Sequence, residues 1–161
     1  MVDTANKQIP ELSIVIPLFN EEDNLAELHR RLAESLGPLA LSYEIVLIND
    51  GSRDSTPQLL DELAQTDPHV TVIHLSRNFG HQPAVCAGLD HARGRVVMIM
   101  DGDLQDPPEV IGQFIERWRD GYDVVYAVRE KRKEGPLKRL GYFTFYRLLN
   151  LISDLRIPLD S

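Results

Sequence analysis

The sequence has little cysteine, no long apolar run and no excess of basic residues. Cys86 is the single cysteine among 161 residues, so the chain cannot form an internal disulfide, and a reducing compartment such as the cytoplasm suits it. The N-terminus is polar, and no apolar run approaches the roughly 18 residues that a membrane-spanning helix needs. We therefore expect a soluble, cytoplasmic chain without a signal peptide or a transmembrane segment.

Basic residues are outnumbered by acidic ones. The chain holds 17 Lys and Arg against 25 Asp and Glu, a formal net charge of −8. Because non-specific affinity for nucleic acids comes largely from Lys and Arg that neutralise phosphates, we expect no nucleic-acid partner. A small phosphorylated ligand bound at one place is compatible with this charge.

Glycine-rich phosphate-binding motifs are absent as well. The chain contains neither the G-x-G-x-x-G fingerprint of dinucleotide-binding domains nor a Walker loop. This absence disfavours a dehydrogenase-like Rossmann domain, and any phosphate must be bound in another way.

Short apolar runs alternate with segments of helical spacing along most of the chain. Strands are expected at 12–17, 43–48, 70–75, 96–100 and 122–128, and helices at 25–36, 56–67, 82–92 and 107–121, with Thr56 as an N-cap. Because the connections are short, the crossovers should be right-handed and the sheet largely parallel. The predicted fold is α/β, a three-layer sandwich whose Rossmann-like sheet carries helices on both faces. It is expected to form one domain over residues 1–161, with a flexible N-terminus at 1–10.

The stretch 94–109 places acidic side chains at the end of an apolar strand. The run 96–100 has no charge, which is typical of a strand covered on both faces of a sheet. Asp101, Asp103 and Gln105 follow at spacings of two, so on an extended backbone they project to the same side. Crowded carboxylates repel one another, and a hard divalent cation relieves that repulsion while it binds substrate phosphate. The stretch therefore predicts a metal and phosphate site.

Three other polar segments follow predicted strands, and each also has a simpler structural explanation. Asn20 and the acids after it can cap a helix, the segment 49–52 can be a tight turn, and His81 can be merely exposed. No role is assigned to His81. Arg129 directly follows the fifth predicted strand, where its guanidinium would suit a diphosphate at the same edge as the metal.

The tail at 130–161 differs in character from the rest. Basic residues cluster at its start, and a helix rich in aromatic residues and leucine is predicted at 137–155. Its apolar surface is wider than a simple two-layer contact requires. We expect another layer of the protein, a membrane surface or a partner to cover it, and self-association as a homo-oligomer is one such arrangement.

Five segments share their order and spacing with a known family: PLFNEE, INDGSRDST, LSRNFGH, MDGDLQDPPE and VVYAVR. From residue 12 to residue 161 the chain resembles the family 2 glycosyltransferases, which have the nucleotide-sugar-binding GT-A fold. It is most similar to those that glycosylate polyprenyl phosphates, such as dolichol-phosphate mannose synthase and bactoprenol glucosyltransferase. The resemblance implies transfer of a sugar from a UDP- or GDP-sugar to a polyprenyl phosphate at the cytoplasmic face of a membrane, with Mg²⁺ or Mn²⁺ as cofactor. A phosphate nucleophile needs little activation, so direct displacement with inversion is the expected mechanism.

The resemblance also implies which residues hold the nucleoside. Pro17, Phe19 and Glu21 match the first-loop residues of the nucleoside site, and Asp50 matches an aspartate that contacts the base or the ribose. Asp101 is assigned to the nucleotide as well as to the metal.

A second group of residues is implied at the diphosphate. Asp101, Asp103 and Gln105 match the metal-binding D-x-D-x-Q motif, in which the cation bridges the donor's diphosphate. Arg129 matches an arginine at the diphosphate, and Asp103 and Arg129 are the expected catalytic residues. The candidates for a further phosphate contact, to the lipid acceptor, are Lys138 and Arg139.

The resemblance departs at the C-terminus. Family members continue beyond the position of Ser161 with a glycine-aspartate-phenylalanine segment, whose aspartate lies near the acceptor, and many then add transmembrane helices. We expect this chain to be a truncated catalytic domain. The alternative is a non-catalytic module that binds nucleotide, self-associates or lies on a membrane surface through its 137–155 helix.

Overall fold

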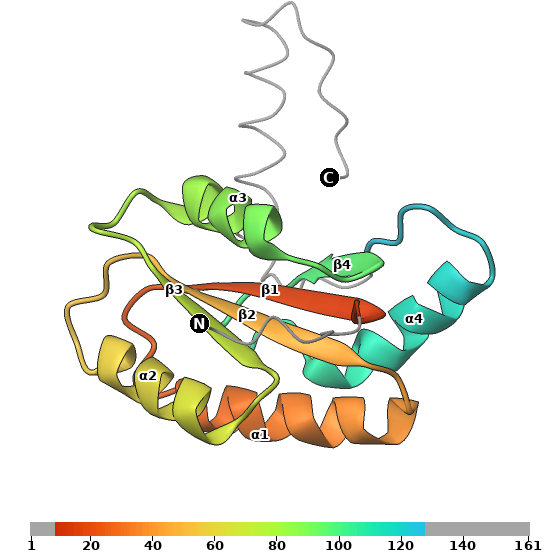
Figure 1. The fold of residues 1–161 in the computed structure, drawn as a ribbon, viewed down its shortest axis with the longest axis horizontal. Coiled ribbons are helices and arrows are strands. Elements are labelled where there is room, and N and C mark those ends of the chain that lie inside the picture. Colours follow the sequence, from red (N-terminus) through yellow and green to blue (C-terminus); the bar gives the residue numbers. More distant parts are fainter. Residues whose placement is uncertain (1–8, 128–161) are drawn as a thin grey trace, which may run out of the picture. The chain divides into compact units, whose positions relative to one another are not determined.

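The computed structural model describes residues 9–127, and residues 1–8 and 128–161 are not described (Figure 1). Its elements lie in the first of the two compact units of the chain, which ends at Val125. In chain order they are β1 (Leu12–Leu18), α1 (Leu25–Leu36), the short 3₁₀ helix η1 (Gly37–Leu39), β2 (Tyr43–Asn49), α2 (Thr56–Thr66), β3 (Val70–His74), α3 (His81–His91), β4 (Val96–Ile99), η2 (Pro108–Val110) and α4 (Ile111–Arg119).

The four strands form one parallel sheet in the order β3-β2-β1-β4. β1 pairs with β2 from Leu12↔Tyr43 to Leu18↔Asn49, and with β4 from Leu12↔Val96 to Val15↔Ile99. The predicted parallel α/β sheet is therefore confirmed, with β1 as an inner strand.

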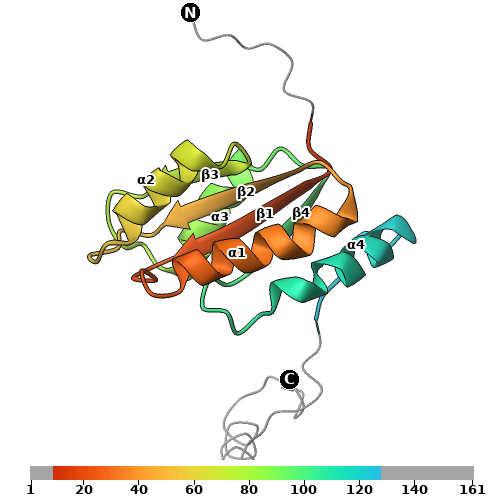
Figure 2. The same ribbon diagram turned by 90° about the horizontal axis from the view of Figure 1, so that it is seen from below.

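Helices cover both faces of this sheet, as predicted (Figures 1 and 2). On one face Leu12, Ile14 and Ile16 of β1 pack with the leucines of α1 and with apolar residues of α2 and α4. On the other face Val15 packs with Ala84 of α3. This alternation follows from the two-residue period of a strand, and each leucine of α1 fully buried in this way stabilises the fold by about 1.5–3 kcal/mol.

β4 differs from its prediction as a strand covered on both faces. Val97 and Ile99 are 38% and 51% exposed, whereas Met100, just beyond the strand, is buried. The register places Val97 and Ile99 on the same face as Val15, where α3 packs on β1 and β2. α3 does not extend over this face of β4, so the face remains partly exposed among the described residues.

The prediction of a fifth strand at 122–128 is wrong for the residues that the structure describes. Residues 122–127 adopt no strand, and Tyr122, Val124 and Tyr126 are exposed. Alternating β-branched and aromatic residues favour a strand only where a neighbouring strand and a packed face support it, and none of the described residues supplies these. The predicted helix 137–155 lies outside the described residues. Within residues 9–127, no helix is long and apolar enough to span a bilayer.

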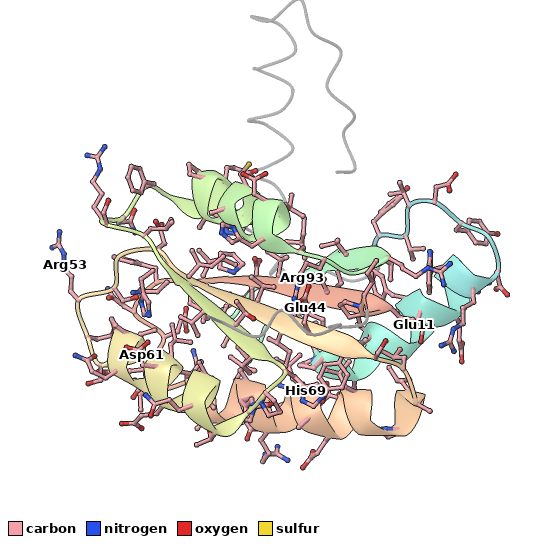
Figure 3. All side chains as sticks on the ribbon, viewed as in Figure 1. Glu11, Glu44, Arg53, Asp61, His69 and Arg93 are labelled. Carbon is pink, nitrogen blue, oxygen red and sulfur yellow. The ribbon has the colours of Figure 1, made fainter. Side chains whose placement is uncertain are left out.

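A buried carboxylate links β1, β2 and the connection before β4 at the amino ends of the strands. Glu44 of β2 is 4% exposed, and its Oε1 accepts hydrogen bonds from the Ser13 hydroxyl (2.6 Å) and the Arg93 backbone N–H (2.7 Å). The Arg93 guanidinium donates to Oε2, and the Gly94 N–H donates to Ser13 Oγ. Figure 3 shows Arg93 beside Glu44. Burial alone would raise the pKa of Glu44, but the donors from Ser13 and Arg93 lower it overall.

We predict that Glu44→Gln lowers the free energy of unfolding by about 1–3 kcal/mol, because it removes charge-assisted hydrogen bonds in a buried position. Since the folded pKa of Glu44 is lowered, its contribution is present above the unfolded pKa and is lost as the pH falls through the folded pKa. Urea unfolding at pH 7 and at successively lower pH should show the difference between variant and parent shrinking. Glu34→Gln, on the exposed surface of α1, is the control and should change stability by less than about 0.5 kcal/mol. An equal effect of both substitutions would contradict this account.

Candidate functional site

A pocket of about 350 Å³ lies at the carboxyl ends of the strands. Residues at or beyond the carboxyl end of each of the four strands contribute to it: Pro17, Leu18, Phe19, Glu21, Asp50, Asn78, Gly80, His81, Ala84, Asp101, Gly102 and Asp103. Its volume falls within the range of small-molecule sites.

The strand order explains why the pocket forms at this place. From β1 the chain moves to β2 and β3 on one side and then crosses to β4 on the other, so the order reverses beside β1. In open parallel sheets the loops diverge at such a reversal and leave a crevice beyond the strand ends. Phe19 follows β1 and Asp101 follows β4, the two strands that flank the reversal.

The structure brings together most of the residues predicted for the nucleotide. Pro17, Phe19, Glu21 and Asp50 all line the pocket, together with Asp101. These residues come from three separate loops of the chain, so their meeting is a consequence of the fold.

The predicted metal ligands divide into two groups. Asp101 and Asp103 line the pocket, whereas Gln105 is exposed and does not. The backbone N–H of Gln105 donates to Asp103 Oδ1 at 2.9 Å. Within the described residues no group of three or more His, Cys, Asp or Glu is arranged to hold a metal ion. Two carboxylates nevertheless suit Mg²⁺ or Mn²⁺, which take one or two carboxylates and complete their shell with water and phosphate oxygens.

The loop that carries these acids is tightly constrained. A Cβ on Gly102 would lie 2.3 Å from Leu18 Cδ2, so only glycine fits there without movement of the core. Leu104 has a φ of 62°, a left-handed conformation that is costly for leucine, while its side chain packs against the main core cluster. At the far end Arg31 of α1 binds Glu109 through two hydrogen bonds of 2.8 and 2.6 Å, which lower the pKa of Glu109 to about 2.

Hydrogen bonds connect the loop after β1 to the loop after β2 and to the first residue of α2. In each of them a backbone N–H of one segment donates to a side-chain oxygen of the other: Asn20 N to Ser52 Oγ (3.0 Å), Glu21 N to Thr56 Oγ1 (2.9 Å), Glu22 N to Asp54 Oδ2 (3.3 Å), Arg53 N to Asn20 Oδ1 (2.8 Å) and Ser55 N to Glu22 Oε2 (2.8 Å). Asn20 therefore does not cap α1, contrary to one interpretation of the sequence. Thr56 is the first residue of α2, and Ser55 precedes it at the N-cap position.

Asp50 connects the loop after β2 to the loop after β3. It is 3% exposed, and its two carboxylate oxygens accept the backbone N–H groups of Phe79 (2.8 Å) and Gly80 (2.9 Å). Asp50 thus holds the residues that precede α3, and its predicted contact with a base or a ribose remains a prediction.

Gly51 lets these two loops approach each other. It has a φ of 65°, and a Cβ there would lie 2.3 Å from the backbone carbon of Arg77. Backbone on both sides leaves no flexible side chain to move away. The chain bends at Gly51, and the Ser52 N–H donates to Asn49 Oδ1 at 2.9 Å, so the segment 49–52 reverses locally as its simpler explanation held and also supports the pocket.

His81 and Asn78 line the pocket although the sequence assigned them no role. The sequence signals were their position after the third strand and their place in the LSRNFGH segment of the resemblance. Arg129, Lys138 and Arg139, expected at the diphosphate or the acceptor phosphate, lie outside the described residues.

A sequence model described as glycosyl transferase family 2 matches residues 13–156. The chain belongs to this family.

Several curated relatives of this family 2 chain are similar over most of its length. It is 46% identical over 149 residues to the uncharacterized glycosyltransferase sll0501 of Synechocystis, which covers 92% of this chain and 47% of the relative. It is 44% identical over 148 residues to the prophage bactoprenol glucosyl transferase homolog of Escherichia coli, and 45% identical over 129 residues to the undecaprenyl-phosphate 4-deoxy-4-formamido-L-arabinose transferase of Pseudomonas fluorescens. These alignments cover 91% and 80% of this chain, and 48% and 38% of the relatives. The chain thus spans less than half the length of these relatives.

Solved structures agree on the GT-A fold of this family 2 domain. A mannosyltransferase from Pyrobaculum calidifontis, in complex with GDP-Man and Mn²⁺, aligns with a TM-score of 0.53 at 27% identity over 60% of this chain and 28% of that one. TarS 1–349 from S. aureus, in complex with UDP-GlcNAc, aligns with a TM-score of 0.59 at 22% identity over 77% of this chain and 38% of that one. The second likeness supports the fold alone.

We predict that Asp50→Asn loosens the segment before α3 in this family 2 domain even without a ligand. An amide group offers one acceptor in place of two and turns an N–H donor toward a backbone N–H. Hydrogen exchange at the Phe79 and Gly80 amides should accelerate by about tenfold or more, because a lost charge-assisted hydrogen bond is worth about 1.5–3 kcal/mol. Glu62→Gln, at an exposed position of α2, is the control. Unchanged exchange at both amides would show that Asp50 does not hold this segment.

We predict that two glycine substitutions differ in their effect on the free energy of unfolding. Gly51→Ala should lower the free energy of unfolding by about 2 kcal/mol or more, because of its φ and its backbone contact with Arg77. Gly37→Ala should leave it unchanged or raise it by up to about 1 kcal/mol, because Gly37 has a helical φ of −52° and a Cβ added there would meet nothing within 4 Å. Thermal or urea unfolding of both variants compares them directly. A stability of Gly51→Ala equal to that of Gly37→Ala would contradict the packing of the two loops.

Proposed function

We propose that this domain is the donor-binding part of a metal-dependent glycosyltransferase, which transfers a sugar from a UDP- or GDP-sugar to a polyprenyl phosphate with inversion at the anomeric carbon. The observation that carries the proposal is the pocket at the carboxyl edge of the sheet. It combines Asp101 and Asp103 with the residues predicted for the nucleoside.

The relatives support this choice of donor and acceptor. The mannosyltransferase structure contains GDP-Man and Mn²⁺, and the names of two relatives specify bactoprenol and undecaprenyl phosphate as what they glycosylate or act on. A lipid acceptor of this kind would bring the domain to the cytoplasmic face of a membrane. Titration with both nucleotides distinguishes a uracil from a guanine base.

The proposed nucleoside site lies on the β1 side of the pocket. Phe19 is partly exposed and offers an aromatic face, while Pro17 at the end of β1 and Glu21 on the same loop as Phe19 also line the pocket. The hydrogen bonds between the loops after β1 and β2 hold these residues in place before a ligand binds. This reduces the conformational entropy that is lost on binding.

The proposed diphosphate site lies on the β4 side. Asp101 and Asp103 would hold Mg²⁺ or Mn²⁺, and Gln105 supports Asp103 through its backbone N–H. A cation bound there supplies positive charge that stabilises the diphosphate as a leaving group. We propose Arg129 as a second source of positive charge, which makes Asp103 and Arg129 the catalytic pair, with Lys138 or Arg139 at a further phosphate.

In the proposed reaction an acceptor phosphate oxygen forms a bond to the anomeric carbon while the bond from that carbon to the donor diphosphate breaks. The acceptor phosphate is already anionic, so no general base is required. The contribution of the protein is to orient the donor and to stabilise the charge that develops on its diphosphate. A single displacement of this kind inverts the configuration at the anomeric carbon.

We predict that UDP or GDP raises the melting temperature of the chain only when Mg²⁺ or Mn²⁺ is present. At about 100 times its Kd, a ligand stabilises the folded state by about 2.7 kcal/mol, or about 5–10 °C for a chain of this size. Asp103→Ala should abolish the metal-dependent shift, because one of two carboxylate ligands is lost. Calorimetric titration with a panel of UDP- and GDP-sugars plus Mn²⁺ then identifies the donor.

The matched control is Asp90→Ala, which removes an exposed carboxylate from α3 outside the pocket and should keep the full shift. If neither nucleotide raises the melting temperature with metal, or if Asp103→Ala keeps the shift, the proposed donor site is wrong. Lipid binding or self-association without any nucleotide effect would favour the non-catalytic alternative.

A further inference from the structure

His81 lines the pocket, and neither the motifs nor the names of the relatives suggest a role for it. It is the first residue of α3, its side chain is 54% exposed, and its ring lines the pocket. Its Nε2 lies 3.9 Å from Asp101 Oδ1, which is too long for a hydrogen bond. Since the ring forms no hydrogen bond within residues 9–127, a ring N–H is available to a ligand.

The charge of the pocket gives His81 particular weight. The described lining residues include four carboxylates, from Glu21, Asp50, Asp101 and Asp103. Among these lining residues only Asn78 and His81 have a side-chain N–H donor, and the ring of His81 lies 3.9 Å from Asp101. A nucleoside diphosphate is strongly anionic, so it requires donors or positive charge where its phosphates lie.

The fold holds His81 in position before a ligand binds. Gly80, the residue before it, donates its N–H to the buried carboxylate of Asp50. Ala84 lies one helical turn later on the same side and also lines the pocket. The ring therefore faces the same pocket as Asp101, next to a segment that Asp50 holds.

We propose that His81 is a phosphate-binding residue of the donor site, whose imidazole N–H donates to a phosphate oxygen of the nucleotide beside Asp101. This inference rests on the proposed function, which places a diphosphate next to Asp101 and Asp103. The inference adds a ligand contact from α3, the helix that lies on the opposite face of the sheet from α1, α2 and α4.

A competing account makes His81 a positioning residue that acts through Asp101. A histidine beside a metal-binding carboxylate can orient it, and loss of such a partner lowers metal affinity. The two accounts differ in a measurable way. Direct phosphate binding lowers the affinity for the nucleotide and leaves the affinity for Mn²⁺ without nucleotide unchanged, whereas positioning of Asp101 lowers the affinity for Mn²⁺ itself.

The test uses the full chain and two separate titrations. Calorimetry measures the affinity for UDP and GDP with saturating Mn²⁺, and electron paramagnetic resonance measures the affinity for Mn²⁺ alone. We expect His81→Ala to weaken nucleoside diphosphate binding about tenfold or more and to change Mn²⁺ affinity by less than about twofold. His81→Gln, which keeps a side-chain N–H donor, should recover part of the loss. His91→Ala, at the other end of α3 and outside the pocket, should behave like the parent chain.

Each other outcome overturns the inference. Unchanged nucleotide affinity in His81→Ala excludes the phosphate contact, and a matching loss of affinity for Mn²⁺ alone assigns His81 to Asp101 instead. If His81→Ala lowers the melting temperature, its loss of affinity does not separate destabilisation from a lost contact, and His81→Gln decides. A His81→Gln variant that has the parent's melting temperature and the low nucleotide affinity of His81→Ala excludes a donor role. If the parent chain binds neither nucleotide, the proposed function itself fails and this inference fails with it.

Discussion

The parallel pairing of β1 with β2 on one side and β4 on the other determines where the polar side chains of this domain meet. Parallel strands place all their carboxyl ends at one edge, and the reversal of strand order beside β1 opens a crevice there. Acids that are separated by tens of residues in the sequence, such as Glu21, Asp50 and Asp101, consequently line one pocket. The apolar layers of α1 and α3 bury β1 on both faces and fix this register.

The loops at this edge support one another rather than standing alone. The first and second loops exchange backbone-to-side-chain hydrogen bonds, and Asp50 then binds the segment before α3. Gly51 allows the second and third loops to touch backbone to backbone. The fourth loop is held separately, through Gly102 against Leu18 and the contact of Glu109 with Arg31. A nucleotide would thus meet a largely prearranged surface, with the cation as the part that must be added.

Much of this architecture could be predicted from the sequence, because the apolar runs of β1, β2 and β3 and the leucine spacing of α1 are local signals. The charge crowding at Asp101 and Asp103 also indicated the edge where the pocket lies. What could not be predicted depends on tertiary partners. The exposure of Val97 and Ile99 follows from where α3 packs, and residues 122–127 have strand-like composition without a strand beside them among the described residues. Asn20 looked like a helix cap, but its side chain accepts the backbone N–H of Arg53 in another loop. Asp50, whose ligand contact remains a prediction, also accepts the backbone N–H groups of Phe79 and Gly80, and no sequence spacing reveals these partners.

The central claim is that a nucleoside diphosphate and a divalent cation bind together at the carboxyl edge of the sheet. Paramagnetic broadening by Mn²⁺ tests it most directly, because in amide NMR spectra only nuclei close to the bound ion lose intensity. With UDP or GDP present, the account predicts broadening at Asp101, Gly102 and Asp103 and at the start of α3, while Glu44 and Arg93 at the opposite end of the sheet stay sharp. Broadening centred on that opposite end, or no nucleotide-dependent broadening at all, would contradict it.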